Sequence, residues 1–200
     1  MKKHSLFYSF AFMLVYPFIH LLYPHRVTGR ELIPDGAAIV CAPHSSYLDP
    51  VLVSLAVGKK HRPYYMAKKE LFSVPLLGAF LKYIGIFPVD RSGGDVESIR
   101  KSMRLLKSGC KVGIFPEGQR VADDDAVAAK TGAVRLAEKM KAPIVPVYVP
   151  RVKKPLRRFK IVIGEPITVE RTAADDYAAE AERVMHIIYE LGETESCTAV

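Results

Sequence analysis

The stretch AAIVCAPHSSYLDPVLVSLAV, residues 37–57, combines an apolar run, a polar turn and an amphipathic segment. Ala37–Cys41 is typical of a buried strand. Pro43 then favours an extended conformation for the residue before it. Asp49-Pro50 predicts a helix start, with the aspartate as N-cap and the proline at the first helical position. A strand that leads through a short turn into a helix indicates an α/β protein.

The same alternation continues along the chain. Because the predicted strands have at most six residues and several end at prolines, we expect an α/β fold with a mixed, irregular β-sheet flanked by helices in a single domain. The predicted strands are Ala37–Cys41, Tyr64–Ala67, Val112–Phe115, Ile144–Val149 and Phe159–Ile163, and the predicted helices are Pro50–Val57, Val74–Tyr83, Val96–Lys107, Thr131–Met140 and Ala173–Leu191.

The predicted helix Val96–Lys107 has the clearest register. Val96, Ile99, Met103 and Leu106 recur every three or four residues and therefore share one face. We expect that face to be buried against the sheet.

Positive charge dominates most of the chain. Residues 1–160 contain 27 Lys and Arg against 12 Asp and Glu, whereas residues 161–200 contain 2 against 9. A basic body suits an anionic partner: a phosphorylated substrate, an acidic membrane surface or a nucleic acid. A nucleic-acid binder is disfavoured, because no aromatic stacking platform is interleaved with the basic residues.

The N-terminus contains no Asp, Glu, Lys or Arg from Ser5 to Pro24. A cleaved signal peptide is excluded because no small-residue cleavage site follows. A transmembrane span of this length would be kinked at Pro17, and a buried core helix is a further alternative. A helix lying in one leaflet beside a basic body fits best. We therefore predict an N-terminal membrane-associated helix over residues 1–25, followed by a catalytic domain over residues 26–200.

Three cysteines, Cys41, Cys110 and Cys197, are too few and too scattered for a disulfide framework or a zinc site. They fit a reducing compartment, and together with the N-terminal helix they predict a protein on the cytoplasmic face of the cell membrane. Cys41 is a candidate nucleophile, but a small buried hydrophobe at a strand end is the favoured interpretation.

His44 and Asp49 are the first candidate functional residues. Five positions on one helix would leave them 140° apart, so they meet only if the chain changes conformation between them. Pro43 and Asp49-Pro50 predict that change. Asp49 would then accept a hydrogen bond from His44 Nδ1–H and leave Nε2 as a general base. On these residues alone, a helix-capping aspartate beside a loop histidine is the alternative.

Two further polar stretches follow apolar segments. GIFPVDR, residues 85–91, ends in Arg91, and FPEGQR, residues 115–120, combines Glu117, Gly118 and Arg120. Gly118 permits backbone geometry that other residues disfavour. The guanidinium groups of Arg91 and Arg120 are suited to bind a phosphate group. Each stretch alone is equally a solvated loop, but together they indicate one site built from several strand exits.

These stretches resemble the 1-acylglycerol-3-phosphate acyltransferase (lysophosphatidate acyltransferase) family. Four blocks of that family occur in order, from about Val27 to Ile167: HSSYLD (44–49), GIFPVDR (85–91), FPEGQR (115–120) and IVPVYV (144–149). Gln119 departs from the family, which usually has Thr or Ser there, and this leaves the acceptor open.

The resemblance implies transfer of an acyl group from acyl-CoA or acyl carrier protein to lysophosphatidate, with no further cofactor and no metal. It implies that His44 is the general base and that Asp49 orients it. It implies that Arg91, Glu117 and Arg120 hold the phosphate and glycerol end of the acceptor. Lys68, or less favourably Lys69, and backbone N–H groups near Gly118 are the expected oxyanion donors.

Other features and rival functions stay open. Asp123–Asp125 is expected to be a solvated loop, and the basic segment RVKKPLRRFK, residues 151–160, either meets anionic lipid head groups or forms a surface turn. Ser45 and Ser46 lie outside a G-x-S-x-G motif, which disfavours a serine hydrolase. The rivals are acyl transfer to another lysophospholipid, to an aminoacyl lipid or to glycerol-3-phosphate, and a non-catalytic lipid-binding protein.

Overall fold

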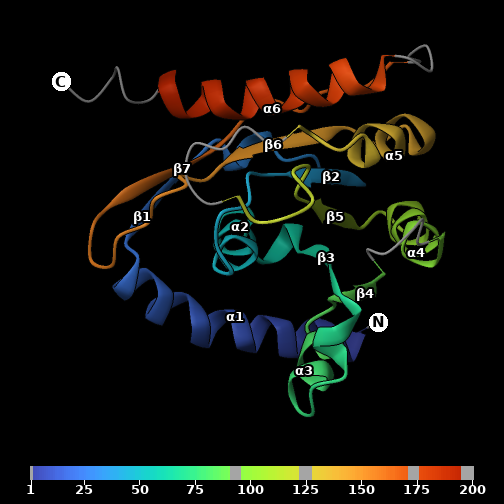
Figure 1. Ribbon diagram of the computed structural model, residues 1–200. Coiled ribbons are helices and arrows are strands. Elements are labelled where there is room, and N and C mark those ends of the chain that lie inside the picture. Colours follow the sequence, from blue (N-terminus) through green and yellow to red (C-terminus); the bar gives the residue numbers. More distant parts are fainter. Residues whose placement is uncertain (1, 91–95, 122–127, 171–175, 195–200) are drawn as a thin grey trace.

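The computed structural model in Figure 1 describes residues 2–90, 96–121, 128–170 and 176–194. In these residues a sheet of seven strands has the order β1-β7-β6-β2-β5-β3-β4. The strands are β1 His25–Thr28, β2 Ala38–Cys41, β3 Pro63–Lys68, β4 Phe87–Val89, β5 Lys111–Ile114, β6 Ile144–Tyr148 and β7 Phe159–Ile163.

The direction of the strands decides where the polar turns lie. β2 pairs in parallel with β5 and with β6, and β3 pairs in parallel with β5 and β4. β7 runs antiparallel to β6, and β1 runs parallel to β7, so the sheet is mixed as expected. The carboxyl ends of β2, β5, β6, β3 and β4 therefore share one edge of the sheet.

Helices cover both faces of the sheet. Side chains alternate between the faces along each strand, so Ile39 packs in one hydrophobic cluster beneath α4, α5 and α6, and Val40 packs in a second one beneath α2. Figure 1 shows α6 on one side of the sheet and α1 and α2 on the other. The helices are α1 Lys2–Leu22, α2 Asp49–Val57, α3 Leu77–Tyr83, α4 Val96–Lys107, α5 Gly132–Met140 and α6 Tyr177–Thr194, with short 3-10 segments η1 Arg30–Leu32, η2 Lys59–His61 and η3 Lys69–Phe72.

All five predicted strands are present, and the sequence analysis missed β1. The segment before Arg91 forms β4. α3 starts at Leu77 rather than at Val74, because Leu76 has φ +65° and ψ −49°, which lies outside the helical region. The predicted start of the last helix, at Ala173, lies outside the described residues.

The predicted face of α4 is only partly buried, because Leu106 and Met103 pack in the core and the predicted Val96 and Ile99 do not. Ser98, Ser102 and Leu106 are buried, whereas Val96 is 55% exposed and Ile99 is 52% exposed. Ser102 Oγ donates a hydrogen bond to the Ser98 carbonyl oxygen at 2.9 Å, so the buried hydroxyl is satisfied within the helix. Two small side chains also let the helix backbone approach the sheet closely.

α1 forms over the apolar N-terminal stretch. Ile19 packs against the core cluster beneath α2, whereas Met13, Leu14, Phe18 and Leu21 are 62–70% exposed. Within the described residues, no helix combines the length and the hydropathy that crossing a bilayer requires. One face of α1 therefore packs against the protein, and another face exposes apolar side chains.

Candidate active site

The turn after β2 brings His44 and Asp49 together. Asp49 Oδ2 lies 3.1 Å from His44 Nδ1 and accepts hydrogen bonds from the backbone N–H groups of Ser45, at 2.7 Å, and Ser46, at 2.6 Å. The expected contact between His44 and Asp49 is present. The expected N-cap role of Asp49 is wrong: α2 begins at Asp49 itself, Leu48 is the N-cap, and the carboxylate binds upstream amides instead.

The ammonium group of Lys153 pairs with the other carboxylate oxygen of Asp49. Its Nζ lies 2.8 Å from Asp49 Oδ1, with the Lys153 side chain 3% exposed and the Asp49 side chain 1% exposed. The ammonium group also donates to Ser45 Oγ at 2.9 Å and to the Arg151 carbonyl oxygen at 3.2 Å. Lys153 thus makes two hydrogen bonds and one ion pair, so this buried cation has a counter-ion and polar partners.

Opposing effects set the charge of Asp49. Burial acts to raise the pKa of its carboxyl group, but the hydrogen bond from His44, the ion pair with Lys153 and the Ser46 amide together hold the pKa below its ordinary value. Asp49 is therefore a carboxylate at neutral pH. An ionised Asp49 favours a proton on His44 Nδ1 and leaves a lone pair on Nε2.

Aromatic rings hold the plane of the His44 imidazole. Phe115, the first residue after β5, stacks on His44 with ring centroids 4.3 Å apart, and Tyr65 stacks on Phe115 at 5.7 Å. The His44 side chain is 13% exposed. The ring is thus fixed by its neighbours and still reaches the surface.

Glu117 is buried beneath His44. Its Oε2 accepts the backbone N–H of His44 at 2.7 Å, and its Oε1 accepts hydrogen bonds from Arg151 Nη2 at 3.0 Å and from Tyr189 OH at 2.9 Å. Burial and the Glu117 charge raise the pKa of Tyr189 to about 12, so that hydroxyl stays a donor. Glu117 is 1% exposed, and both of its oxygens already bind the protein. In this structure Glu117 supports the His44 turn, and its expected contact with an acceptor stays a prediction.

Sequence analysis missed the role of Arg151 and Lys153. Both were part of a basic segment expected at lipid head groups or in a surface turn. β6 is the neighbour of β2 and parallel to it, so the residues that follow β6 emerge beside those that follow β2. The block IVPVYV predicts β6 from the sequence. Only the order of the strands in the sheet shows that Arg151 and Lys153, which follow β6, lie beside His44 and Asp49.

Gly118 and Arg120 form the outer part of the turn after β5. Gly118 has φ +70°, and a Cβ there would meet the Lys130 side chain at 2.5–2.8 Å. Its own N–H donates to the Phe115 carbonyl oxygen at 2.9 Å, so that N–H already has a backbone partner, and the oxyanion donors expected near Gly118 stay a prediction. Arg120 is exposed, and its guanidinium lies 3.7 Å from the ring centroid of Tyr47, which is 71% exposed.

The other predicted residues lie apart from this network. Lys68 ends β3 and is exposed, and no hydrogen bond or ion pair within the described residues joins it to His44 or Asp49. Lys69 pairs with Asp90 beyond β4. Arg91 and Asp123–Asp125 lie outside the described residues. Cys41 is fully buried, and burial raises the pKa of its thiol to about 12, which confirms its interpretation as a core residue.

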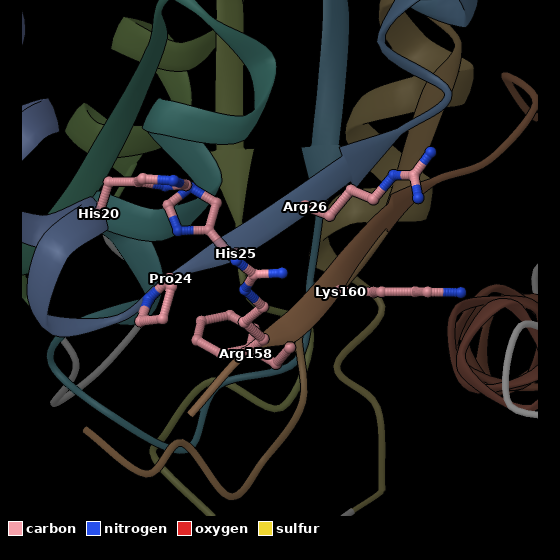
Figure 2. Close-up of a pocket in the computed structure, with 7 residues that line it drawn as sticks. His20, Pro24, His25, Arg26, Arg158 and Lys160 are labelled. Carbon is pink, nitrogen blue, oxygen red and sulfur yellow. The ribbon is translucent and has the colours of Figure 1, made fainter. Parts of the chain in front are cut away.

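A separate cavity lies at the start of β1 and β7. Its volume is about 470 Å³, and neither His44 nor Asp49 lines it. Figure 2 shows His20 and His25 meeting on one side, while Arg26 and Lys160 extend together in another direction. The cavity is thus a cationic surface feature at the end of α1 and not part of the His44 site. Its lining residues are His20, Pro24, His25, Arg26, Arg158, Phe159 and Lys160.

Comparison with known families gives one consistent result. The model of the family described as Acyltransferase matches residues 25–150. The chain is 41% identical over 149 residues to the 1-acyl-sn-glycerol-3-phosphate acyltransferase of Bacillus subtilis, covering 71% of this chain and 73% of that protein. It is 30% identical over 183 residues to the human 1-acyl-sn-glycerol-3-phosphate acyltransferase alpha, covering 84% of this chain and 64% of that protein.

A solved structure supports the fold. The crystal structure of the 1-acyl-sn-glycerophosphate acyltransferase PlsC from Thermotoga maritima superimposes with a TM-score of 0.67 at 24% identity. The match covers 97% of this chain and 79% of that one. At this identity the likeness concerns the fold alone.

Proposed function

Because the chain belongs to the family of 1-acylglycerol-3-phosphate acyltransferases, we propose that it transfers a fatty acyl group from an acyl thioester to the free hydroxyl of 1-acylglycerol-3-phosphate, giving phosphatidate. The observation that carries the proposal is the contact between His44 Nδ1 and Asp49 Oδ2 at 3.1 Å. This contact leaves a basic nitrogen at the carboxyl edge of the sheet, where loops of several strands converge.

In the proposed reaction the acceptor supplies the nucleophile. His44 Nε2 removes the proton of the glycerol hydroxyl as its oxygen attacks the thioester carbonyl carbon. The tetrahedral intermediate then expels the thiolate, which receives the proton from the His44 imidazolium. The new ester bond replaces the thioester bond, and free thiol leaves. Asp49 stabilises the imidazolium between the two proton transfers.

The exposed residues are proposed to bind the substrates. Arg120 stacks on Tyr47 at the mouth of the site and offers its guanidinium fork to the acceptor phosphate. By resemblance to the family, Arg91 shares that task. Lys68 at the end of β3 remains the candidate oxyanion donor. The donor is acyl-CoA or acyl carrier protein carrying the acyl chain, and neither form requires a further cofactor or a metal.

We also propose that α1 lies in the cytoplasmic leaflet of the cell membrane. The exposed apolar side chains of α1 and those of Leu76, Leu77 and Phe80 at α3 support this, since large exposed apolar patches mark interaction surfaces. Figure 1 shows α1 and α3 on the same side of the molecule. The cationic cavity of Figure 2 lies at the carboxyl end of α1, where anionic lipid head groups would meet positive charge.

A donor-by-acceptor matrix tests the proposed reaction. Purified protein is mixed with acyl-CoA or acyl carrier protein thioester and with lysophosphatidate, another lysophospholipid or glycerol-3-phosphate, and thiol release is measured. We expect the highest kcat/KM with lysophosphatidate, with phosphatidate as product. Higher turnover with another acceptor would replace the proposed substrate. No turnover with any pair, while the protein binds vesicles, would favour the lipid-binding alternative.

A flotation assay tests the membrane proposal. The variant Leu14→Ser/Phe18→Ser should lose binding to vesicles of anionic glycerophospholipids, because both side chains lie on the outer face of α1. The matched control is Val96→Ser/Ile99→Ser, which removes two exposed apolar side chains from α4. Equal vesicle binding by the two variants would contradict the assignment of α1 as the membrane contact.

A further inference from the structure

We infer that Lys153 is a positioning residue of the proposed acyl transfer: its buried ammonium group balances the charge of Asp49 and thereby sets the pH range in which His44 is a base. The inference rests on the proposed function for its kinetic consequence. Lys153 belongs to none of the blocks that identify the family.

The burial of Lys153 is the first observation. Lysine side chains are almost never fully buried unless they are paired, and the Lys153 side chain is 3% exposed. Its neighbour Lys154 is exposed. Two adjacent lysines of one segment thus lie in opposite environments, and only one of them faces the His44–Asp49 pair.

The partners of Lys153 are the second observation. Its ammonium group forms an ion pair with Asp49 Oδ1 and donates hydrogen bonds to Ser45 Oγ and to the Arg151 carbonyl oxygen. Asp49 Oδ2 already accepts His44 Nδ1 and two backbone amides. Lys153 therefore neutralises the carboxylate from the side opposite the imidazole and fixes its orientation.

Neutralisation of Asp49 changes the proton equilibrium of its histidine partner. A buried carboxylate without a counter-ion would strongly stabilise the His44 imidazolium, which has no lone pair for catalysis. Lys153 opposes a second positive charge on the imidazole. The Asp49–Lys153 ion pair is nearly neutral as a unit, so Lys153 reduces the negative charge that His44 faces while Asp49 still orients the ring.

The test compares Lys153→Met with Lys154→Met. In Lys153→Met the acid limb of the pH profile of kcat/KM should move up by about one pH unit, because an opposing charge has been removed. The NMR titration of the His44 imidazole should move by the same amount. Lys154→Met should leave both curves in place. A fall in kcat with an unmoved acid limb and an unmoved titration would show a purely structural role and overturn the inference.

A second variant covers the case in which Lys153→Met does not fold. Asp49→Asn/Lys153→Met removes both charges of the buried pair, a change that proteins tolerate better than loss of one partner. We expect the double variant to show a cooperative unfolding transition even where Lys153→Met shows none, and a higher Tm than Lys153→Met where both fold. A double variant no more stable than Lys153→Met would overturn the coupling between Lys153 and Asp49.

The NMR titration of His44 distinguishes a failure of this inference from a failure of the proposed function. If the wild-type protein shows no acyl transfer and the His44 titration still moves in Lys153→Met, the proposed function fails and the electrostatic role of Lys153 stands. If acyl transfer occurs and neither the acid limb nor the titration moves, the proposed function stands and the inference fails.

Discussion

The candidate site has two parts that differ in their environment. The loops after β2 and β6, together with Glu117 after β5, form a buried part in which His44, Asp49, Glu117, Arg151 and Lys153 bind one another. The outer part consists of exposed side chains, with Arg120 over Tyr47 and Lys68 at the end of β3. The sequence blocks give no hint of this division, because FPEGQR contributes Glu117 to the first part and Arg120 to the second.

The difference separates two tasks. A general base needs a fixed tautomer and a fixed direction, which buried and mutually bonded partners provide before substrate arrives. A phosphate-bearing lipid head group is large and hydrated, and exposed arginine side chains can adjust to it. Substitutions in the buried part should therefore affect turnover and folding, and substitutions in the outer part should affect substrate binding.

The largest effect is expected from His44→Ala. Removal of the proposed general base should lower kcat by about 10³-fold, within the range of general acid–base catalysis. Thiol release from the acyl donor with lysophosphatidate measures this loss, and vesicle flotation should be unchanged. Undiminished turnover in His44→Ala would exclude His44 as the base.

Glu117→Ala should lower the stability of the folded protein. It removes the buried carboxylate that accepts hydrogen bonds from the His44 backbone N–H and from Arg151, whose side chain is 24% exposed, and we expect this to cost about 1–3 kcal/mol of unfolding free energy. Urea unfolding measures the change, with the exposed Glu31→Ala as control. If Glu117→Ala keeps wild-type stability and only raises KM for the acceptor, Glu117 belongs to the outer part.

Arg120→Ala should change binding without changing folding. Because its guanidinium is exposed beside Tyr47, we expect about a tenfold rise in KM for phosphate-bearing acceptors, with little change in KM for the acyl donor or in Tm. Steady-state kinetics with each substrate varied in turn distinguishes the two KM values. Equal rises in both would place Arg120 at the donor as well.

The smallest effect on turnover is expected from Cys41→Ala. The thiol is fully buried and its pKa is raised to about 12 by burial, so it is neither accessible nor a thiolate at neutral pH. We expect wild-type kcat and a loss of stability of about 1 kcal/mol. Loss of turnover in a folded Cys41→Ala protein would restore Cys41 as a nucleophile.

The sequence predicted the helices and strands better than it predicted which strands lie next to each other in the sheet. Local signals mark β2, the turn at Pro43 and the start of α2, and they predicted the contact between His44 and Asp49. They did not reveal that β6 adjoins β2, because strand order depends on long-range packing. Arg151 and Lys153 were therefore interpreted as surface residues.

The periodicity of apolar residues also failed to predict the buried face of a helix in which the buried side chains are small. In α4 the apolar pattern predicted a buried Val96 and Ile99, whereas Ser98 and Ser102 face the core. A serine hydroxyl that bonds to its own helix backbone is buried at little cost, and hydropathy alone does not register this. Similarly, the Asp-Pro pair predicted an N-cap, yet the Asp49 carboxylate binds upstream amides in the preceding turn.

The adjacency of β2 and β6 also fixes when this site is completed during synthesis. Ser45 and Lys153 are 108 positions apart, and joining such distant segments requires closure of a long loop. A nascent chain that has already exposed His44 and Asp49 has yet to add the segment after β6, in which Lys153 is the counter-ion of Asp49. The base is therefore assembled late, when most of the sheet exists, so acyl-transfer activity would report completed folding of the domain.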